Sequence, residues 1–303
     1  MALVKRPKLP ARSFPFAAPT VPKGVERRDE ERTSGPDYDT AWSRRTPARY
    51  ARFFLVEGPM RAFVKAVADP IRIGTDRLAD VDGPLIFAGN HHSHLDAPLL
   101  LTSIPEPWRH KTVVAAAADY FFTNAVTSAT SALALGAVPI ERTKVSRRTS
   151  DRAAELLADG WSLVIFPEGG RSPDGWGQGH RGGAAYLAAR TGVPVVPVHI
   201  QGTNRIFAKG DRRLRPGTTK VTFGAPMVPL ETDNSTRFAA RIEAAVAALA
   251  DEARSDWWSA RRRAGAGTTP ALTGPDVRSW RRAWALGDRR GRAQRRSPRW
   301  PEL

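Results

Sequence analysis

The chain has 303 residues, no cysteine and a formal net charge of +17 at pH 7. This length is enough for one domain with a substantial core and two tails. Without cysteine, disulfides, thiolate metal ligands and a cysteine acyl-enzyme intermediate are excluded. The basic, proline-rich start lacks the apolar core of a secretory signal, and no apolar run of about 18 residues predicts a membrane-spanning helix.

The first part of the chain, residues 1–48, is rich in proline and charge without an apolar period, which predicts disorder. From Arg49 the pattern becomes amphipathic, and the apolar residues between Met60 and Val67 recur at helical spacing. Pro59 suits the first position of a new helix. The stretch 53–67 fits a helix packed on its own core as well as it fits a helix lying on a membrane surface.

Short apolar runs and helical patterns then alternate along the chain. The predicted strands are 84–89, 112–117, 137–141, 162–167, 194–200 and 220–224, and the predicted helices are 95–104, 120–134, 147–159, 180–191 and 234–253. Such alternation favours an α/β sandwich with a largely parallel sheet flanked by helices. We assign residues 49–253 to this domain, without a prediction of the strand order.

The last part of the chain, residues 254–303, has thirteen arginines and five tryptophans but too few aliphatic residues for a core. Tryptophan with arginine suits the interface of a bilayer, and it also suits stacking and phosphate contacts with nucleic acid. We predict that this tail is disordered or contacts a membrane. A solvated tail without a function is the alternative.

Residues 90–96 read Asn-His-His-Ser-His-Leu-Asp, between a predicted strand and a predicted helix. His91, with Asp96 five residues later, is a candidate general base with an orienting carboxylate. On a regular helix five residues turn through about 500°, so the two side chains would diverge by about 140°. They can therefore meet only at a strand-to-helix corner, where helix N-terminal amides also favour an oxyanion or a phosphate.

Two alternatives compete with this interpretation of the heptapeptide. His91, His94 and Asp96 are a possible ligand set for zinc or iron. The histidines could instead only cap and pack a turn.

Three further segments belong to predicted strands or follow them directly. The strand 136–142 ends in Arg142, the segment 166–172 reads Phe-Pro-Glu-Gly-Gly-Arg-Ser, and 193–198 reads Val-Pro-Val-Val-Pro-Val. The crevice beyond the carboxyl ends of parallel strands is the usual ligand site in open α/β sheets. Arginine forks fit phosphate oxygens, and paired glycines let backbone amides approach an anion. The segments therefore predict an anion-binding site close to His91.

In these four segments the chain resembles the glycerolipid acyltransferase family, typified by the 1-acylglycerol-3-phosphate acyltransferases. The family pattern comprises N-H-x-S-x-x-D, G-x-x-x-x-x-R, F-P-E-G-x-R-S and a V-P-V-V-P-V-like strand. The chain matches the first block at every fixed position, while Gly170 stands where the family most often has threonine. The resemblance covers residues 49–230 and implies the α/β fold of glycerol-3-phosphate acyltransferases.

The resemblance implies transfer of a fatty acyl group from acyl-CoA or acyl carrier protein to 1-acylglycerol 3-phosphate, giving phosphatidate. His91 would take the hydroxyl proton, and Asp96 would hold the imidazole in the right tautomer. Arg142 and Arg171 would hold the acceptor phosphate, with backbone amides from Gly169. Glu168 would orient Arg171 or bind a glycerol hydroxyl. No metal and no cofactor beyond the acyl donor is required.

These substrates imply an enzyme in the cytoplasm, attached peripherally to the anionic inner face of the membrane through the stretch 53–67 and the tail. Within the class, the acceptor could instead be glycerol 3-phosphate, another lysophospholipid, or a lipid alcohol or amine. Outside it, the alternatives are a zinc hydrolase and a basic nucleic-acid-binding protein. The basic charge lies outside the predicted domain and no nucleic-acid motif is present, so we expect no specific nucleic acid.

Overall fold

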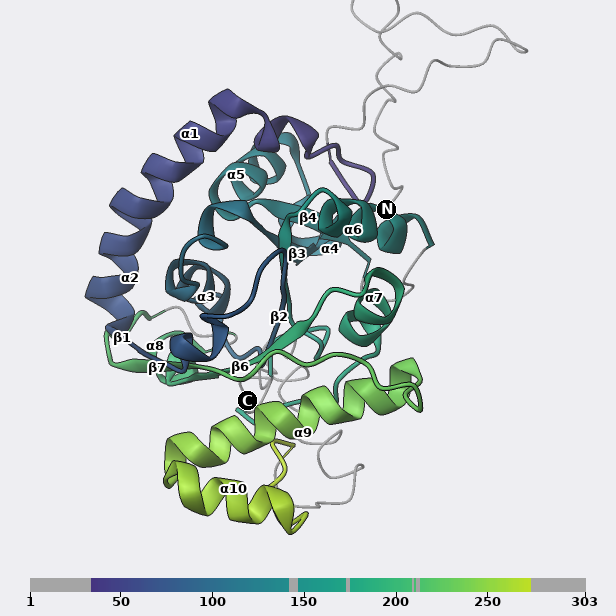
Figure 1. Ribbon diagram of the computed structural model, residues 1–303. Coiled ribbons are helices and arrows are strands. Elements are labelled where there is room, and N and C mark those ends of the chain that lie inside the picture. The colour runs from purple at the N-terminus through teal and green to yellow at the C-terminus, as the bar shows by residue number, and fades with distance from the viewer. Residues whose placement is uncertain (1–33, 142–146, 173–174, 209, 211–212, 274–303) are drawn as a thin grey trace, which may run out of the picture. The chain divides into compact units, whose positions relative to one another are not determined.

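The computed structural model describes residues 34–141, 147–172, 175–208, 210 and 213–273 (Figure 1). A seven-stranded sheet lies at the centre, in the order β1-β7-β6-β2-β5-β3-β4, and every neighbouring pair is parallel except the antiparallel β6 and β7. Its strands are β1 Pro70–Ile73, β2 Ile86–Gly89, β3 Thr112–Ala117, β4 Ala137–Ile140, β5 Ser162–Ile165, β6 Val195–Gln201 and β7 Thr219–Phe223. The predicted α/β architecture with a largely parallel sheet is confirmed.

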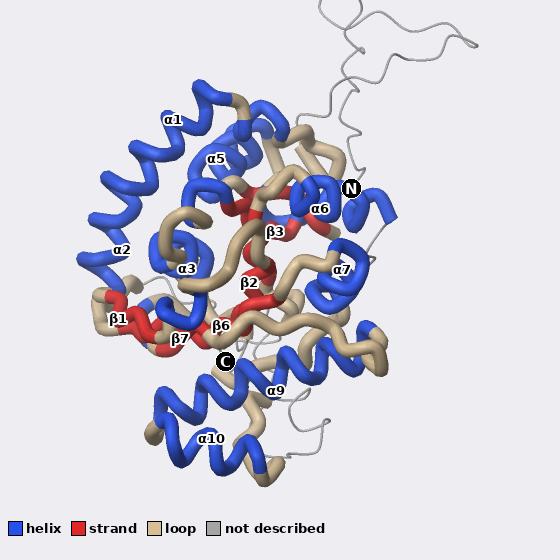
Figure 2. Tube along the Cα trace, in the orientation of Figure 1, coloured by secondary structure: helices blue, strands red, loops and turns tan. Residues whose placement is uncertain are grey.

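Helices cover both faces of this sheet, as Figure 2 shows in blue around the red strands. Those of eight or more residues are α1 Thr46–Leu55, α2 Arg61–Ala68, α3 Asp96–Ser103, α5 Ala125–Leu135, α6 Arg147–Ala158, α7 Gly183–Thr191, α9 Ser235–Arg254 and α10 Trp257–Gly265. The short helices and turns are η1 Ala41–Arg44, η2 Val56–Met60, η3 Thr75–Leu78, η4 Arg109–Lys111, α4 Ala118–Phe121 and α8 Thr203–Ile206. The sheet thus separates two apolar cores, one beneath α2 and α3 and the other beneath α6, α7 and α9.

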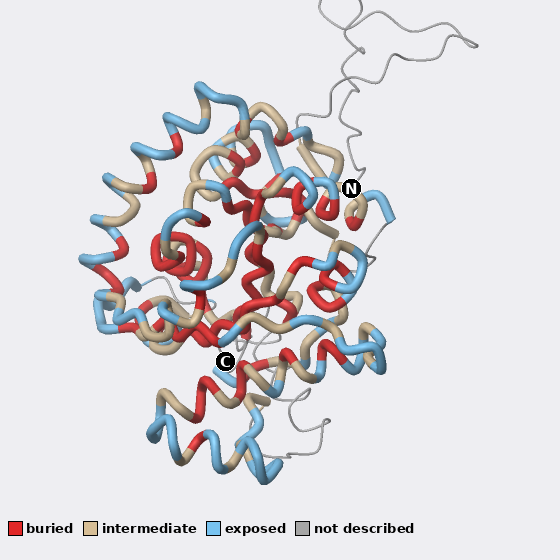
Figure 3. The backbone as a smooth tube through the Cα atoms, viewed as in Figure 1, coloured by how far each residue is buried: buried red, intermediate tan, exposed pale blue. Residues whose placement is uncertain are grey.

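The central strand β2 explains the apolar run that precedes the heptapeptide. All four of its residues are buried, because it has strands on both sides and helices on both faces (Figure 3). Such a strand needs apolar side chains at every position rather than alternating ones. The six predicted strands are all present, whereas β1 was missed because this short edge strand is only partly buried.

One predicted helix, 120–134, is in fact two. α4 ends at Phe121, and α5 begins after Asn124, whose side-chain oxygen accepts from the backbone N–H of Thr127 at 3.0 Å. This cap satisfies one of the free amides at the start of α5 and so restarts the helix.

Pro59 does not begin a new helix. It lies inside η2, a π-helical turn that joins α1 to α2. A wide turn tolerates a residue that lacks a backbone N–H, so the chain continues as helix through the proline. Figure 1 shows α1 and α2 as one nearly continuous rod along the sheet.

Two predictions of disorder need correction. In residues 34–48, Thr40 and Ser43 are buried, and the ring of Tyr38 lies 5.6 Å from that of Phe122. In the tail, α10 packs on α9 through Arg263, whose guanidinium binds both carboxylate oxygens of Asp251 at 2.6 and 2.9 Å. Local composition gave no sign of these contacts with distant residues. The predictions for residues 1–33 and 274–303 lie outside the described residues.

Within the described part of the chain, no helix combines the length and the apolar character needed to cross a bilayer.

Candidate active site

His91 and Asp96 meet at the corner between β2 and α3. Nδ1 of His91 lies 2.9 Å from Oδ2 of Asp96, which is completely buried. β2 ends at Gly89 and α3 begins at Asp96, so the histidine lies in the connecting turn and the aspartate in the first turn of the helix. This is the strand-to-helix geometry that the spacing requires.

The same carboxylate oxygen organises the rest of the turn. Oδ2 of Asp96 also accepts from the backbone N–H groups of His92 at 2.6 Å and Ser93 at 2.7 Å. Burial alone would raise the pKa of Asp96, but the interactions with His91, Ser93 and Thr203 outweigh it and hold the pKa below its usual value. Asp96 is therefore an anion, and Nδ1 of His91 must carry the proton between them. Nε2 is then the ring nitrogen that can accept a proton.

Asn90 and Ser93, the two other fixed residues of the heptapeptide, attach this corner to distant segments. The Asn90 side chain donates to Ile200 O at 2.9 Å and accepts from Ile200 N at 2.7 Å. The Ser93 hydroxyl donates to Phe207 O at 2.7 Å. Sequence reasoning assigned no role to either residue, and their partners could not have been found from local spacing.

His91 lines a cavity of about 130 Å³ at the carboxyl ends of β3 and β5. The ring of Phe166 stacks on the imidazole, with centroids 4.2 Å apart and planes 17° apart. Tyr120 and Arg171 also line the cavity, and the guanidinium carbon of Arg171 lies 5.7 Å from the centre of the Tyr120 ring. The structure thus brings a candidate base and a predicted anion-binding arginine to one cavity.

Glu168 supports the backbone at His91. Its Oε1 accepts from the N–H of His91 at 2.9 Å, and its Oε2 accepts from the N–H of Gln178 at 3.0 Å. Burial raises the pKa of Glu168 to about 7, and the negative charges of Asp96 and Glu243 add to the shift. The sequence predicted that this carboxylate would orient Arg171 or bind a substrate hydroxyl, whereas both oxygens bind backbone.

Gly169 also has a role that differs from the predicted one. Its N–H donates to Phe166 O at 3.0 Å, so this amide closes a turn instead of facing a ligand. Its φ is +70°, and a Cβ there would lie 2.7 Å from the guanidinium of Arg181. Glycine is therefore favoured by the backbone angle, and it leaves space for the guanidinium of Arg181, a residue that the sequence did not single out.

Arg142, the other arginine predicted to bind phosphate, lies outside the described residues.

A second, larger cavity of about 460 Å³ lies between α6 and α7 against β3, β4 and β5. Ala115 and Ile140, near the carboxyl ends of β3 and β4, line both this cavity and the one beside His91. Most of the side chains that line the larger cavity are aliphatic, including Val138, Leu156, Leu163, Ile165 and Leu187. This lining suits a long apolar group.

The three residues of the alternative metal site have other partners. Nδ1 of His91 bonds to Asp96, and Nε2 of His94 lies 2.9 Å from the hydroxyl of Tyr120. Burial, with the nearby charges of Arg171 and His91, lowers the pKa of His94 to about 4. His94 is thus a neutral wall residue of the cavity.

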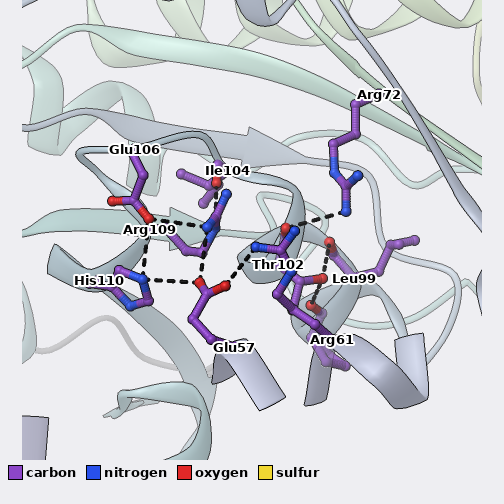
Figure 4. A network of polar contacts seen from close by, with 10 residues as sticks. Glu57, Arg61, Arg72, Leu99, Thr102, Ile104, Glu106, Arg109 and His110 are labelled. Atoms are coloured by element: carbon purple, nitrogen blue, oxygen red, sulfur yellow. Dashed lines mark hydrogen bonds and ion pairs between the residues drawn. The ribbon is translucent and has the colours of Figure 1, made fainter. Parts of the chain in front are cut away.

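Among the described residues, one different group brings three metal-type donors within 4.8 Å of one another: Glu57, Glu106 and His110 (Figure 4). Arg109 Nη1 lies 2.9 Å from Oε1 of Glu57 and 3.1 Å from Oε1 of Glu106, and Arg61 Nη1 lies 2.6 Å from Oε2 of Glu57. Because the two arginines already supply positive charge, this donor set does not suit a cation. It is an ion-pair network that ties η2 to η4.

The chain is similar to known acyltransferases. A family model described as acyltransferase matches residues 70–201, a range that includes His91, Asp96 and Glu168. The chain is 33% identical over 165 residues to the chloroplastic 1-acyl-sn-glycerol-3-phosphate acyltransferase BAT2 of Brassica napus, covering 53% of this chain and 45% of that protein. It is 26% identical over 151 residues to the human 1-acyl-sn-glycerol-3-phosphate acyltransferase alpha, covering 49% and 51%.

Among solved structures, the chain is similar to the 1-acyl-sn-glycerophosphate acyltransferase PlsC of Thermotoga maritima. The TM-score is 0.57 at 26% sequence identity, and the match covers 69% of this chain and 82% of that one. The chain spans about half the length of the curated relatives it matches. The family match ends near the end of β6, so α1, α2, α9 and α10 lie outside it.

Proposed function

The chain belongs to the glycerolipid acyltransferase family typified by the 1-acylglycerol-3-phosphate acyltransferases, and from this premise we propose that it is an O-acyltransferase that forms phosphatidate. A fatty acyl group moves from the thioester of coenzyme A or acyl carrier protein to the free hydroxyl of 1-acylglycerol 3-phosphate. The observation that carries the proposal is the His91–Asp96 pair, joined at 2.9 Å beside a cavity that Arg171 also lines.

In the proposed reaction His91 is the general base. Its Nε2 takes the proton of the acceptor hydroxyl while that oxygen attacks the thioester carbonyl carbon. The carbon–sulfur bond then breaks, and the imidazolium returns the proton to the leaving thiolate. Asp96 keeps Nδ1 protonated and stabilises the charged ring. Because the ester forms directly, the reaction needs neither a cysteine nor a metal.

We assign the acceptor phosphate to Arg171, with Arg142 as a second partner. A guanidinium presents paired N–H donors that fit two phosphate oxygens, and this would fix the neighbouring hydroxyl beside His91. Glu168 and Gly169 contribute indirectly in this proposal. Glu168 holds the N–H of His91, and Gly169 leaves room for Arg181.

We assign the acyl chain of the donor to the aliphatic cavity between α6 and α7. Ala115 and Ile140 line both cavities, and in this proposal the acyl chain passes these residues so that the thioester lies near Nε2 of His91. Burial of a long chain stabilises binding by about 0.8 kcal/mol per methylene, which favours this apolar space over the surface.

We further propose that the protein meets its lipid substrates at the anionic inner face of the cytoplasmic membrane. The α1–η2–α2 rod exposes four aromatic side chains: Tyr50, Phe53, Phe54 and Phe63. Phe54 is 69% exposed and Tyr50 is 65% exposed, which is unusual for large aromatic rings. Arg49 and Lys65 are exposed on the same rod, Arg45 is exposed directly before it, and their charges fit acidic headgroups.

The experiment that tests the reaction measures thiol release from oleoyl-coenzyme A by the purified full chain. Acceptors are 1-oleoylglycerol 3-phosphate, glycerol 3-phosphate or none, and His91→Ala is compared with the natural protein. We expect release that depends on the lysophospholipid and falls by about 10²–10⁴-fold in the variant. Undiminished release by His91→Ala would refute the base assignment.

The same assay separates the alternative acceptors within the class. Faster release with glycerol 3-phosphate, or with a lysophospholipid that carries a larger headgroup, would replace the proposed acceptor and leave the chemistry intact. If coenzyme A thioesters fail with all acceptors, the assay is repeated with an acyl carrier protein donor.

A further inference from the structure

The two carboxylate oxygens of Asp96 differ in their hydrogen bonds. Among the described residues, Oδ2 accepts three hydrogen bonds, from His91 Nδ1 and from the N–H groups of His92 and Ser93. Oδ1 is fully buried and has no partner that meets hydrogen-bond geometry within the described structure. A buried carboxylate oxygen without a donor is costly, so a neighbouring hydroxyl lowers the free energy by turning toward it.

Thr203 is the side chain that can fill this role. It is the first residue of α8 and is buried, and its hydroxyl acts on Asp96 by lowering the pKa of that carboxyl. Its Oγ1, like Oδ1 of Asp96, has no other partner of good geometry in the part of the chain that the structure describes.

The backbone around Thr203 is fixed to the corner that holds Asp96. Ile200, three residues before it, forms both hydrogen bonds with Asn90. Phe207, four residues after it, accepts from Ser93, and Ala208 forms a bridge with Ser93. The segment 200–208 is therefore attached to the heptapeptide on both sides of Thr203. This explains why the hydroxyl reaches a residue more than a hundred positions earlier in the sequence.

We propose that Thr203 is a positioning residue whose hydroxyl donates to Oδ1 of Asp96. With Oδ1 held, the carboxylate cannot rotate about its terminal bond, and Oδ2 stays directed at Nδ1 of His91. A hydroxyl rotates at little cost, so this bond can tighten when the imidazole becomes charged during the reaction. The expected loss of kcat rests on the proposed function. The hydrogen bond from Thr203 to Asp96 does not, because it belongs to the folded protein without substrate.

The test compares side chains that differ only in the hydroxyl. Thr203→Val keeps the shape and removes the donor, while Thr203→Ser keeps the donor and removes a methyl group. Thr222→Val is the matched control, because Thr222 is equally buried and its Oγ1 also has no partner of good geometry. We expect kcat to fall by about 10²-fold in Thr203→Val with little change in KM. Thr203→Ser should keep most of kcat, and Thr222→Val should be unchanged.

A second readout does not depend on activity. In protein labelled with ¹⁵N-histidine, the Nδ1–H proton of His91 should be seen at low field because it is held by Asp96, and it is assigned by its loss in His91→Ala. We expect this signal to broaden or disappear in Thr203→Val and to remain in Thr203→Ser. If the protein has no acyltransferase activity, this result still decides the role of Thr203.

An unchanged kcat and an unchanged proton signal in Thr203→Val would overturn the proposal. So would an equal loss in Thr203→Val and Thr222→Val, since that would mean general damage to packing. If Thr203→Val does not fold, Thr203→Ala is compared with Thr203→Ser, which again differ only by the hydroxyl. Equal activity and equal proton signals in that pair would also overturn the proposal.

Discussion

Oε1 of Glu168 accepts a hydrogen bond at 2.9 Å from the backbone N–H of His91. The Phe-Pro-Glu-Gly segment therefore reaches across to the strand-to-helix corner and fixes the main chain at the proposed base. A further bond, from Ser172 N to His91 O at 2.8 Å, holds the other side of the same residue. The position of His91 thus depends on a segment at the end of a different strand.

Glu168 should make the stability of the protein depend on pH near neutrality. Burial raises the pKa of Glu168 to about 7 from an ordinary value of 4.5. Between these values the folded state binds more protons at this site than the unfolded state, so its contribution to stability falls as pH rises. In Glu168→Gln, which cannot titrate at this position, the free energy of unfolding should therefore fall less between these pH values than in the natural protein. Urea unfolding of both proteins at about pH 5 and about pH 8 measures this change in unfolding free energy. An equal change in both proteins would contradict the raised pKa of Glu168.

Asp96→Asn should lower turnover severely without removing the side chain. The amide cannot stabilise a charged imidazole, and with its NH₂ group toward His91 it would favour the wrong tautomer. We expect a loss of about 10³-fold or more in kcat. Because Oδ2 also accepts from two backbone amides, the thermal midpoint is measured alongside. Normal turnover in a folded Asp96→Asn protein would argue against the paired mechanism.

Arg171→Ala should mainly raise KM for an acceptor that carries a phosphate. A charged hydrogen bond to the ligand is lost, and the expected increase is roughly 10–100-fold. Arg190→Ala is a suitable control, because Arg190 is an exposed residue of α7 paired with Asp151. If both variants raise KM equally, the effect is one of overall charge, and the phosphate does not bind at Arg171.

The aromatic face of the α1–η2–α2 rod should bind anionic vesicles. Phe54→Ser combined with Tyr50→Ser should reduce cosedimentation with phosphatidylglycerol-containing liposomes at low salt. Val126→Ser is the control, since Val126 is an exposed aliphatic residue on α5. Lack of cosedimentation by the natural protein at low salt would remove the membrane proposal itself.

Gly136 should be far more sensitive to substitution than another glycine of similar backbone angle. Gly136 and Gly192 end helices with φ of +62° and +71°, but a Cβ at Gly136 would lie 2.7 Å from the guanidinium of Arg52, whereas Gly192 faces open space. Arg52 is buried and donates to Thr112 O at 2.7 Å and Leu135 O at 3.1 Å.

Gly192→Ala should therefore cost about 1–2 kcal/mol of unfolding free energy from backbone strain alone. Gly136→Ala should cost more, because Arg52 must also move and lose its bonds to the two carbonyl groups. Urea unfolding measures both variants. Equal losses would mean that the Arg52 side chain gives way without cost.

The amino-acid sequence by itself determined the α/β class, the strands from β2 to β7 and the residues that meet at the corner. These features follow from local patterns: a buried central strand needs a continuous apolar run, and a base five residues from its carboxylate needs a turn between them. The family resemblance rests on the same short segments. The strand order and β1 did not follow from such patterns, because strand pairing depends on residues far apart in the chain.

Only the tertiary structure decided how the site is held together. Glu168 is 77 residues from His91, and Asn90 is 110 residues from Ile200, so no local period relates them. No local period relates Thr203 to Asp96 either. Residues 34–48 likewise owe their defined structure to distant partners, such as Phe122 beside Tyr38. A buried polar group takes whichever donor or acceptor the fold brings to it, since leaving it unpaired is costly. The identity of that partner depends on the packing of whole elements, which the order of neighbouring residues does not specify.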